Sequence, residues 1–242
     1  MAADLMVAAG HVVVLHARYE QRAAAARSSI PGAEAVVIGD LSSIDATREV
    51  ANQVNRLGAF DAVIHNAGIG YRERQRTATA DGLPNVFAVN SLAPYILTAL
   101  INKPKRLVYI SSGMHHGAEP ELDDLEWTHR PWSGARAYAE SKLHNVILAF
   151  AVARKWPDVL SNALEPGWVP TKMGGRGAPD DLDAGSRTQV WLATSEERAA
   201  KVRGGYFYHL KPREANPAAA DKSIQERFLA ACARLSGVPF PA

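Results

Sequence analysis

The sequence predicts an α/β domain built on a doubly wound, parallel sheet. Short runs of apolar and β-branched residues alternate along the chain with longer stretches of helical character. The short runs show little alternation between apolar and polar positions, which is typical of parallel strands covered on both faces. No Ser- or Gly-rich linker, charge block or repeat divides residues 1–242, so we expect a single domain.

The short runs have the length and composition of strands. They lie at residues 11–15, 35–38, 62–65, 107–110, 159–164 and 206–208. The stretches between them that are long enough to cross from one parallel strand to the next are 17–28, 43–57, 85–100 and 135–156. This βα alternation is the pattern of a doubly wound fold.

Local signals mark the ends of these helices. Ser42 or Ser43 is a suitable N-cap for the helix at 43–57, and Gly58 stands where a glycine would end it. Pro94 predicts a kink in the helix at 85–100, and Pro157 follows the end of the last helix. The alanine-rich residues 1–9 look like half of a helix that leads directly into the first strand.

Charge and composition narrow the class of function. The chain has 27 Lys and Arg against 25 Asp and Glu, and a net charge of +2 gives no field strong enough to imply nucleic acid or an anionic membrane surface. A single cysteine, Cys232, rules out an internal disulfide. No apolar run approaches the roughly 20 residues of a membrane span. We therefore expect a cytoplasmic protein without nucleic-acid or membrane partners.

The segments that follow the strands are the candidates for a binding site. Ligands of doubly wound sheets bind outside the carboxyl ends of the strands, so the residues found there matter most. After the third, fourth and fifth strands the chain reads Asn66-Ala67-Gly68, Ser111-Ser112-Gly113 and Pro166-Gly167-Trp168-Val169-Pro170-Thr171.

The helix at 135–156 carries Tyr138 and, four residues on, Lys142. This spacing places an ammonium and a phenol on one helical face, and a nearby positive charge lowers the pKa of a tyrosine from about 10. Each pKa unit requires roughly 1.4 kcal/mol, whereas one exposed pair supplies about 0.2 to 0.5 kcal/mol. We therefore expect a desolvated site or further positive charge, such as that of an oxidised nicotinamide.

Several of these motifs occur in a fixed order, each on the element where it would be needed: Asn66-Ala67-Gly68, Asn90, Ser112, Tyr138, Lys142 and Pro166-Gly167. In this order the whole chain resembles the short-chain dehydrogenase/reductase family. The long segment between Ser112 and Tyr138 resembles the retinol-dehydrogenase-like branch of that family. The resemblance implies a Rossmann-like fold and an NAD(P)-dependent oxidoreductase that interconverts a carbonyl and an alcohol by hydride transfer.

The resemblance also implies catalytic roles. Tyr138 would be the acid or base at the substrate oxygen, and Ser112 would hydrogen-bond the same oxygen. Lys142 would bind the nicotinamide ribose and lower the pKa of Tyr138, while Asn90 matches the asparagine that holds a proton-relay water. The physical chemistry agrees, because a hydroxyl and a phenol that converge on one oxygen stabilise the charge that develops there.

Cofactor contacts are implied at both ends of a dinucleotide. On the adenosine side, the backbone at Asn66, Ala67 and Gly68 would approach the cofactor. On the carboxamide side the resemblance implies a turn made by Pro166, Gly167, Val169 and Thr171.

The choice of cofactor is implied by the residues after the first two strands. Asp40-Leu41 resembles the acidic position that contacts adenine. Arg18 stands where NAD-binding proteins usually have Asp or Glu, and arginine accommodates a 2′-phosphate. The sequence therefore favours NADP over NAD.

Bulky side chains suggest the kind of substrate. Trp132, Trp168, Met114 and His115 could together form an apolar pocket, which would suit a hydrophobic carbonyl or alcohol. The pair His115-His116 has no third ligand at a clear spacing, so no metal is expected.

The chain departs from the family pattern at its start. The family begins with a strand, a glycine-rich turn and a helix whose N-terminus holds the pyrophosphate, and none of this is present here. We expect about 20 to 25 residues to be absent relative to the family, which would leave strands unpaired in the interior of the sheet. We also expect the chain alone to bind dinucleotide weakly or not at all.

Other interpretations remain open because of this departure. A catalytically silent remnant of the family could act as a dimerising or regulatory module. In either case the helices at 85–100 and 135–156, where family members often pair, could form a homodimer or homotetramer. Epimerase or dehydratase chemistry is a third interpretation, although those relatives usually carry a larger C-terminal substrate region.

Overall fold

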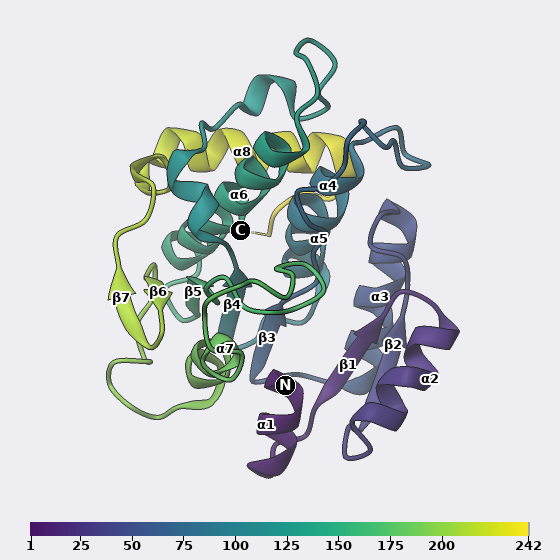
Figure 1. The fold of residues 1–242 in the computed structure, drawn as a ribbon, viewed down its shortest axis with the longest axis vertical. Coiled ribbons are helices and arrows are strands. Elements are labelled where there is room, and N and C mark those ends of the chain that lie inside the picture. The colour runs from purple at the N-terminus through teal and green to yellow at the C-terminus, as the bar shows by residue number, and fades with distance from the viewer. Residues whose placement is uncertain (242) are drawn as a thin grey trace.

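The strands of the computed structural model, which describes residues 1–241, form two sheets (Figure 1). In the smaller sheet β1 (Val14–Ala17) pairs in parallel with β2 (Ala35–Ile38). The larger sheet has the order β3 (Ala62–His65), β4 (Arg106–Ile110), β5 (Leu160–Glu165), β6 (Tyr206–Tyr208) and β7 (Lys211–Arg213). Pairing is parallel from β3 to β6, and β7 runs antiparallel to β6.

Helices connect the strands and cover both faces of the larger sheet. They are α1 (Ala2–Ala8), α2 (Glu20–Ser29), α3 (Ile44–Leu57), α4 (Asn85–Phe87), α5 (Ala93–Leu100), α6 (Gly134–Lys155), α7 (Ala184–Thr194) and α8 (Lys222–Ser236). Alternate residues of β4 show the two faces. Leu107 and Tyr109 join the core under α6, whereas Val108 and Ile110 join a second cluster with Leu192 of α7. The predicted doubly wound α/β class is confirmed.

The predicted strand positions are largely correct. Those expected at 35–38, 62–65 and 206–208 coincide with β2, β3 and β6. The strand expected at 11–15 begins and ends later, as β1. The antiparallel β7 was not expected, because its three residues include Pro212 and carry no β-branched run.

A single continuous sheet is not formed. Within the described residues β1 pairs only with β2, and β3 pairs only with β4. The second edge of β1 and the second edge of β3 are therefore both unpaired. Figure 1 shows the two edges side by side with a space between them. Burial reflects this arrangement: every residue of β4 is buried, whereas β3 has only His65 buried and β1 only Ala17.

The helix signals act much as expected. The Ser43 side chain accepts a hydrogen bond from the main-chain N–H of Ala46 at the start of α3, and Gly58 ends this helix with φ +116°. The helix expected at 85–100 is divided into α4, a π-helical turn (Ala88–Leu92) and α5. Pro94 lies at the start of α5, where its missing N–H does not break a helical hydrogen bond.

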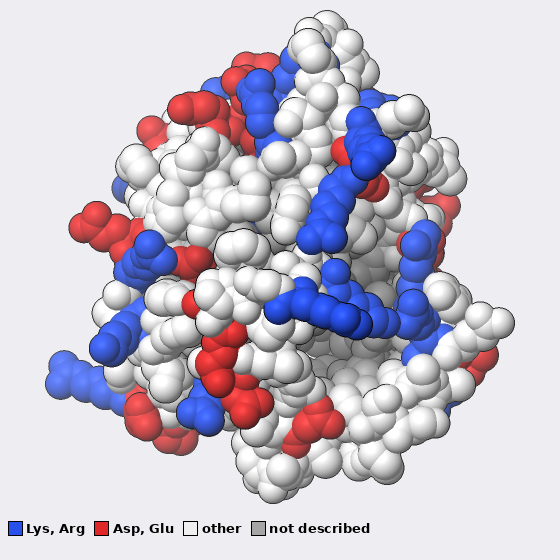
Figure 2. All heavy atoms as spheres, viewed as in Figure 1, with Lys and Arg blue, Asp and Glu red and all other residues white. Residues whose placement is uncertain are grey.

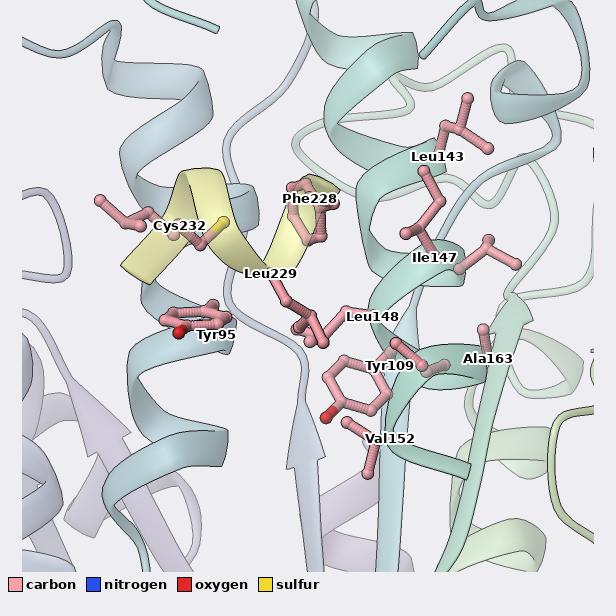
Figure 3. Close-up of a cluster of buried hydrophobic side chains, with 14 of the residues drawn as sticks. Tyr95, Tyr109, Leu143, Ile147, Leu148, Val152, Ala163, Phe228, Leu229 and Cys232 are labelled. Carbon is pink, nitrogen blue, oxygen red and sulfur yellow. The ribbon is translucent and has the colours of Figure 1, made fainter. Parts of the chain in front are cut away.

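The main hydrophobic core lies between β4–β5 and α6 and extends outward to α8 (Figure 3). Leu148 of α6 and Phe228 of α8 are both fully buried, and Cys232 is buried beside them. The phenol of Tyr95 in α5 donates to the main-chain oxygen of Val238, which fastens the segment after α8. Because α8 lies on α5 and α6, a homodimer built through those two helices would have to accommodate or displace it.

Candidate active site

Ser112, Tyr138 and Lys142 come together above the carboxyl end of β4. Ser112 follows this strand and caps a 3₁₀ helix (Gly113–Gly117) by accepting a hydrogen bond from the main-chain N–H of Met114. Tyr138 and Lys142 lie on one face of α6 with 6% and 4% of their surface exposed. The Ser112 side chain lies beside the Tyr138 phenol and favours its ionised form, and Lys142 Nζ lies 5.5 Å from the centre of the Tyr138 ring.

The Lys142 ammonium is buried and points toward the end of β4. Its Nζ donates to the main-chain oxygen of Ile110 at 3.0 Å, and the amide of Asn145 donates to the same oxygen. Burial lowers the pKa of Lys142 to about 8. The sheet therefore holds the Lys142 ammonium beside the phenol. Burial removes this ammonium from water, which disfavours its charged form.

The electrostatic expectation for Tyr138 is wrong in this ligand-free structure. Burial raises the pKa of the Tyr138 phenol, and the Ser112 side chain offsets this only in part. Lys142 directs its ammonium to the Ile110 carbonyl. Sequence spacing placed the two groups correctly, but desolvation outweighs their attraction.

The side chain of Asn90 links three parts of the site. Its Oδ1 accepts the main-chain N–H of Ile69 at 2.8 Å, and its Nδ2 donates to the main-chain oxygen of the same residue at 3.0 Å. The Nδ2 atom also donates to Ser141 Oγ. Asn90 thus joins the π-helical turn to the segment after β3 and to α6, and its amide is fully engaged.

The segment after β3 supplies an open backbone surface next to these groups. A side-chain Cβ at Gly68 would lie 3.4 Å from Asn90 Oδ1 and 3.4 Å from Lys142 Nζ, so the main chain of Gly68 lies directly beside both groups. Asn66 and Ala67 are exposed. All three lie where a cofactor could approach the main chain.

The predicted turn after β5 forms, and its continuation covers the phenol. Gly167 has φ +87°, a conformation that favours glycine, and Thr171 Oγ1 accepts the main-chain N–H of Gly174. Met173 Sδ lies 3.7 Å from the Tyr138 hydroxyl, while the ring of Tyr71 meets that of Tyr138 edge to face at 5.6 Å. Met173 and Tyr71 therefore form the wall nearest to the reacting oxygen.

The rest of this turn is built into the surrounding loops. Pro166 and Val169 pack against Gly185 at the start of α7, where a Cβ would lie 2.6 Å from Val169 Cγ1. The neighbouring Trp168 is 57% exposed. Its indole donates to the main-chain oxygen of Gly174.

The three residues predicted to select the cofactor lie on the smaller sheet. Arg18 and Asp40 form an ion pair at 2.7 Å. Partial burial opposes it, but hydrogen bonds from Arg18 and Ser42 hold the pKa of Asp40 below its usual value. Leu41 is 6% exposed and packs in a core cluster with Val37, so only its main chain could touch a ligand. No contact joins this group to Ser112, Tyr138 or Lys142 in the described residues.

The expected apolar pocket is only partly formed. Met114 is 39% exposed, and Trp132 packs on Trp127 and donates to the main-chain oxygen of Glu73. His115 is wrong as a pocket residue, because it is completely buried behind Ser112. Sequence reasoning also missed its partner Asn216, which stands 101 positions away and gives no local signal.

Figure 2 shows a hollow on the face that carries the two sheet edges, with Lys and Arg side chains gathered around it. In residues 1–241 no cluster of three or more His, Cys, Asp or Glu could hold a metal ion. None of the helices in the same range is long and apolar enough to cross a membrane.

Comparisons with known proteins agree with this geometry. A family model for short chain dehydrogenases matches residues 1–115. An uncharacterized oxidoreductase of Emericella nidulans is 45% identical, with 99% of this chain and 93% of that protein covered. Human retinol dehydrogenase 13 is 30% identical over 84% of this chain and 68% of its own. A crystal structure of an uncharacterized Mycobacterium paratuberculosis protein superimposes with a TM-score of 0.85 at 25% identity, covering all of this chain and 90% of the other.

The chain therefore belongs to the short-chain dehydrogenase/reductase family. Membership in this family indicates oxidoreduction that depends on NAD or NADP and acts on a small molecule.

Proposed function

We propose that this protein is an NADP-preferring oxidoreductase that interconverts a carbonyl and an alcohol, with Tyr138 as the acid or base. The observation that carries the proposal is the convergence of Ser112 on the Tyr138 phenol beside a buried ammonium. Two hydroxyl groups at one position can hydrogen-bond the same substrate oxygen and stabilise charge that develops on it. A bound reduced nicotinamide supplies the hydride.

The residues of the chain manage the proton. Because burial raises the pKa of Tyr138, its phenol keeps its proton at neutral pH and is ready to donate it to a carbonyl oxygen. Ser112 orients that oxygen, and Lys142 places positive charge near the phenolate that forms.

The fit to a dinucleotide differs between its two ends. The buried ammonium of Lys142 would meet the nicotinamide ribose, and the basic hollow in Figure 2 suits an anionic cofactor. These residues include no glycine-rich turn for the pyrophosphate. Calorimetry with NADPH measures how tightly these residues bind the dinucleotide.

Arg18 supports NADP over NAD. Its guanidinium is 60% exposed as a side chain and is held by Asp40 alone among the acidic groups described. A 2′-phosphate, with more negative charge than a carboxylate, could replace or share this partner. Asp40 would then hold the arginine in place before the cofactor arrives.

An apolar carbonyl compound is the substrate class that the walls favour. Met173 and Tyr71 present a thioether and an aromatic ring beside the reacting hydroxyl, and Trp168 is exposed on the same loop. Contact between such surfaces and an apolar substrate would stabilise the bound state. Because Trp168 is exposed, its side chain is the one among these that could move onto a bound ligand.

The test is turnover by the purified chain with a panel of apolar aldehydes and ketones at high NADPH concentration. The expected result is carbonyl-dependent loss of the reduced-nicotinamide absorbance, slower with NADH. If no compound is reduced and the chain instead self-associates tightly in ultracentrifugation, the alternative of a silent, dimerising module gains support. The unpaired edges of β1 and β3 in the described residues are the observation that favours this alternative.

A further inference from the structure

A buried histidine lies directly behind the serine of the active site. His115 is 0% exposed in the 3₁₀ helix Gly113–Gly117. Its Nδ1 is 2.7 Å from the main-chain oxygen of Ser112. Its Nε2 is 3.2 Å from the main-chain nitrogen of Asn216.

These two partners determine where the ring proton lies. The Ser112 carbonyl can only accept and the Asn216 amide N–H can only donate, so Nδ1 carries the hydrogen and Nε2 offers a lone pair. A charged ring would set an N–H against the Asn216 N–H. Burial, as the largest influence, accordingly lowers the pKa of His115 to about 4, which keeps the ring neutral.

Asn216 holds the same short helix at several other points. Its Nδ2 donates to the main-chain oxygens of His115 at 3.1 Å and Ala118 at 2.9 Å, with a longer contact to that of His116. Its Oδ1 accepts the main-chain N–H of Ala218 at 3.0 Å. One side chain therefore ties the turn after β4 to the segment that leads into α8.

The Ser112 carbonyl receives two hydrogen bonds from one residue. The main-chain N–H of His115 donates to it at 3.0 Å, in addition to the ring Nδ1–H. The orientation of the peptide after Ser112, and with it the position of the Ser112 main chain that carries the hydroxyl group, is therefore fixed by His115.

We propose that His115 and Asn216 are positioning residues that hold the Ser112 hydroxyl on the substrate oxygen and couple the active site to the C-terminal segment. This inference rests on the proposed function. A displacement of about 1 Å in a catalytic group can cost roughly 100-fold in rate. The effect should appear in kcat, because the ring touches neither substrate nor cofactor.

The kinetic test compares two substitutions of the same residue. His115→Leu fills the space but removes both ring hydrogen bonds, and we expect kcat to fall about 10-fold or more with little change in the KM for NADPH. His115→Asn keeps an amide N–H near the Nδ1 position and should restore part of the loss. His129→Leu, at an exposed histidine, is the matched control and should leave kcat unchanged. Equal kcat for wild type and a folded His115→Leu variant would overturn the proposal.

A spectroscopic test does not depend on turnover. Histidine ¹⁵N–¹H spectra of the wild type should show His115 as the Nδ1–H tautomer at neutral pH, and Asn216→Asp, which keeps the acceptor but loses the amide donors, should perturb that signal. An Nε2–H tautomer in the wild type would refute the positioning scheme even if His115→Leu fails to fold. An intact Nδ1–H signal together with no carbonyl turnover by the wild type would instead count against the proposed function.

Discussion

The two sheets of this molecule differ in how firmly they are built. The larger sheet packs β4 and β5 between α6 and α7, and Leu148 and Ala163 at its centre are completely buried. The smaller sheet has two strands, of which β1 buries Ala17 and β2 buries Val37. A two-stranded sheet is marginal by itself, because most of its apolar surface and one edge remain open.

The candidate catalytic and cofactor-selecting residues are divided along this line. Ser112, Tyr138 and Lys142 rest on the well-packed sheet, so their relative positions are fixed without a ligand. Arg18 and Asp40 rest on the smaller sheet and are joined mainly to each other. The candidate catalytic residues can therefore be held in place by a well-packed sheet, while the candidate cofactor-selecting residues, on a loosely packed sheet, can still change position.

The largest expected effect is on chemistry at the larger sheet. Tyr138→Phe removes the proton donor and should lower kcat by about 10² to 10⁴-fold. Steady-state rates with NADPH and a reducible carbonyl measure it. Tyr208→Phe, on β6, is the matched control; a Tyr138→Phe variant as fast as this control would show that the phenol is not the acid.

Acid should weaken the larger sheet next. Burial lowers the pKa values of His65 on β3 and His144 on α6 to about 3, against about 6.5 when unfolded. The stability that depends on these neutral rings is complete above about pH 6.5 and is lost as pH falls toward 3. Burial also lowers the pKa of His115 to about 4. With about three protons taken up on unfolding, the free energy of unfolding should fall by about 4 kcal/mol per pH unit near pH 5. Urea unfolding at pH 7, 6 and 5 tests this, and His65→Gln should lower the slope by about a third.

Truncating a packed side chain should lower the free energy of unfolding by a similar or smaller amount. The size of the loss should differ between the two sheets. Leu148→Ala creates a cavity in the main core and should lower the free energy of unfolding by about 2 to 5 kcal/mol. Val36→Ala, at a half-buried position of β2, should cost less than about 1 kcal/mol. Chemical denaturation measures both. Equal losses would mean that the sheets share one core.

The smallest expected effect concerns cofactor choice. Arg18→Gln should raise the KM for NADPH about 10-fold, which corresponds to roughly 1.4 kcal/mol, and leave kcat and the KM for NADH unchanged. Arg22→Gln, at a neighbouring exposed arginine bonded to Tyr19, is the control. A parallel rise of both KM values would show that Arg18 does not read the 2′-phosphate.

Much of the catalytic part could be predicted because its signals are local. Strands β2, β3 and β6 follow from short apolar runs, and Tyr138 with Lys142 follows from spacing on one helix. These features depend on periodicity, which a sequence displays directly. Ser112 follows from its place after a buried strand.

The features that could not be predicted depend on burial and on distant pairing. The raised pKa of Tyr138 reflects desolvation, whereas sequence shows only the neighbouring charge of Lys142. The ion pair of Arg18 with Asp40 and the hold of Asn216 on His115 join residues that nothing in the sequence brings together. Tertiary structure alone supplies these contacts.

Hydrogen–deuterium exchange on the ligand-free chain tests the contrast between the two sheets most directly. The account predicts that amides of β4, β5 and α6 exchange only through global unfolding, while those of β1 and β2 exchange earlier through a separate, local opening. Exchange of all five elements at one common rate, with one dependence on denaturant, would contradict it.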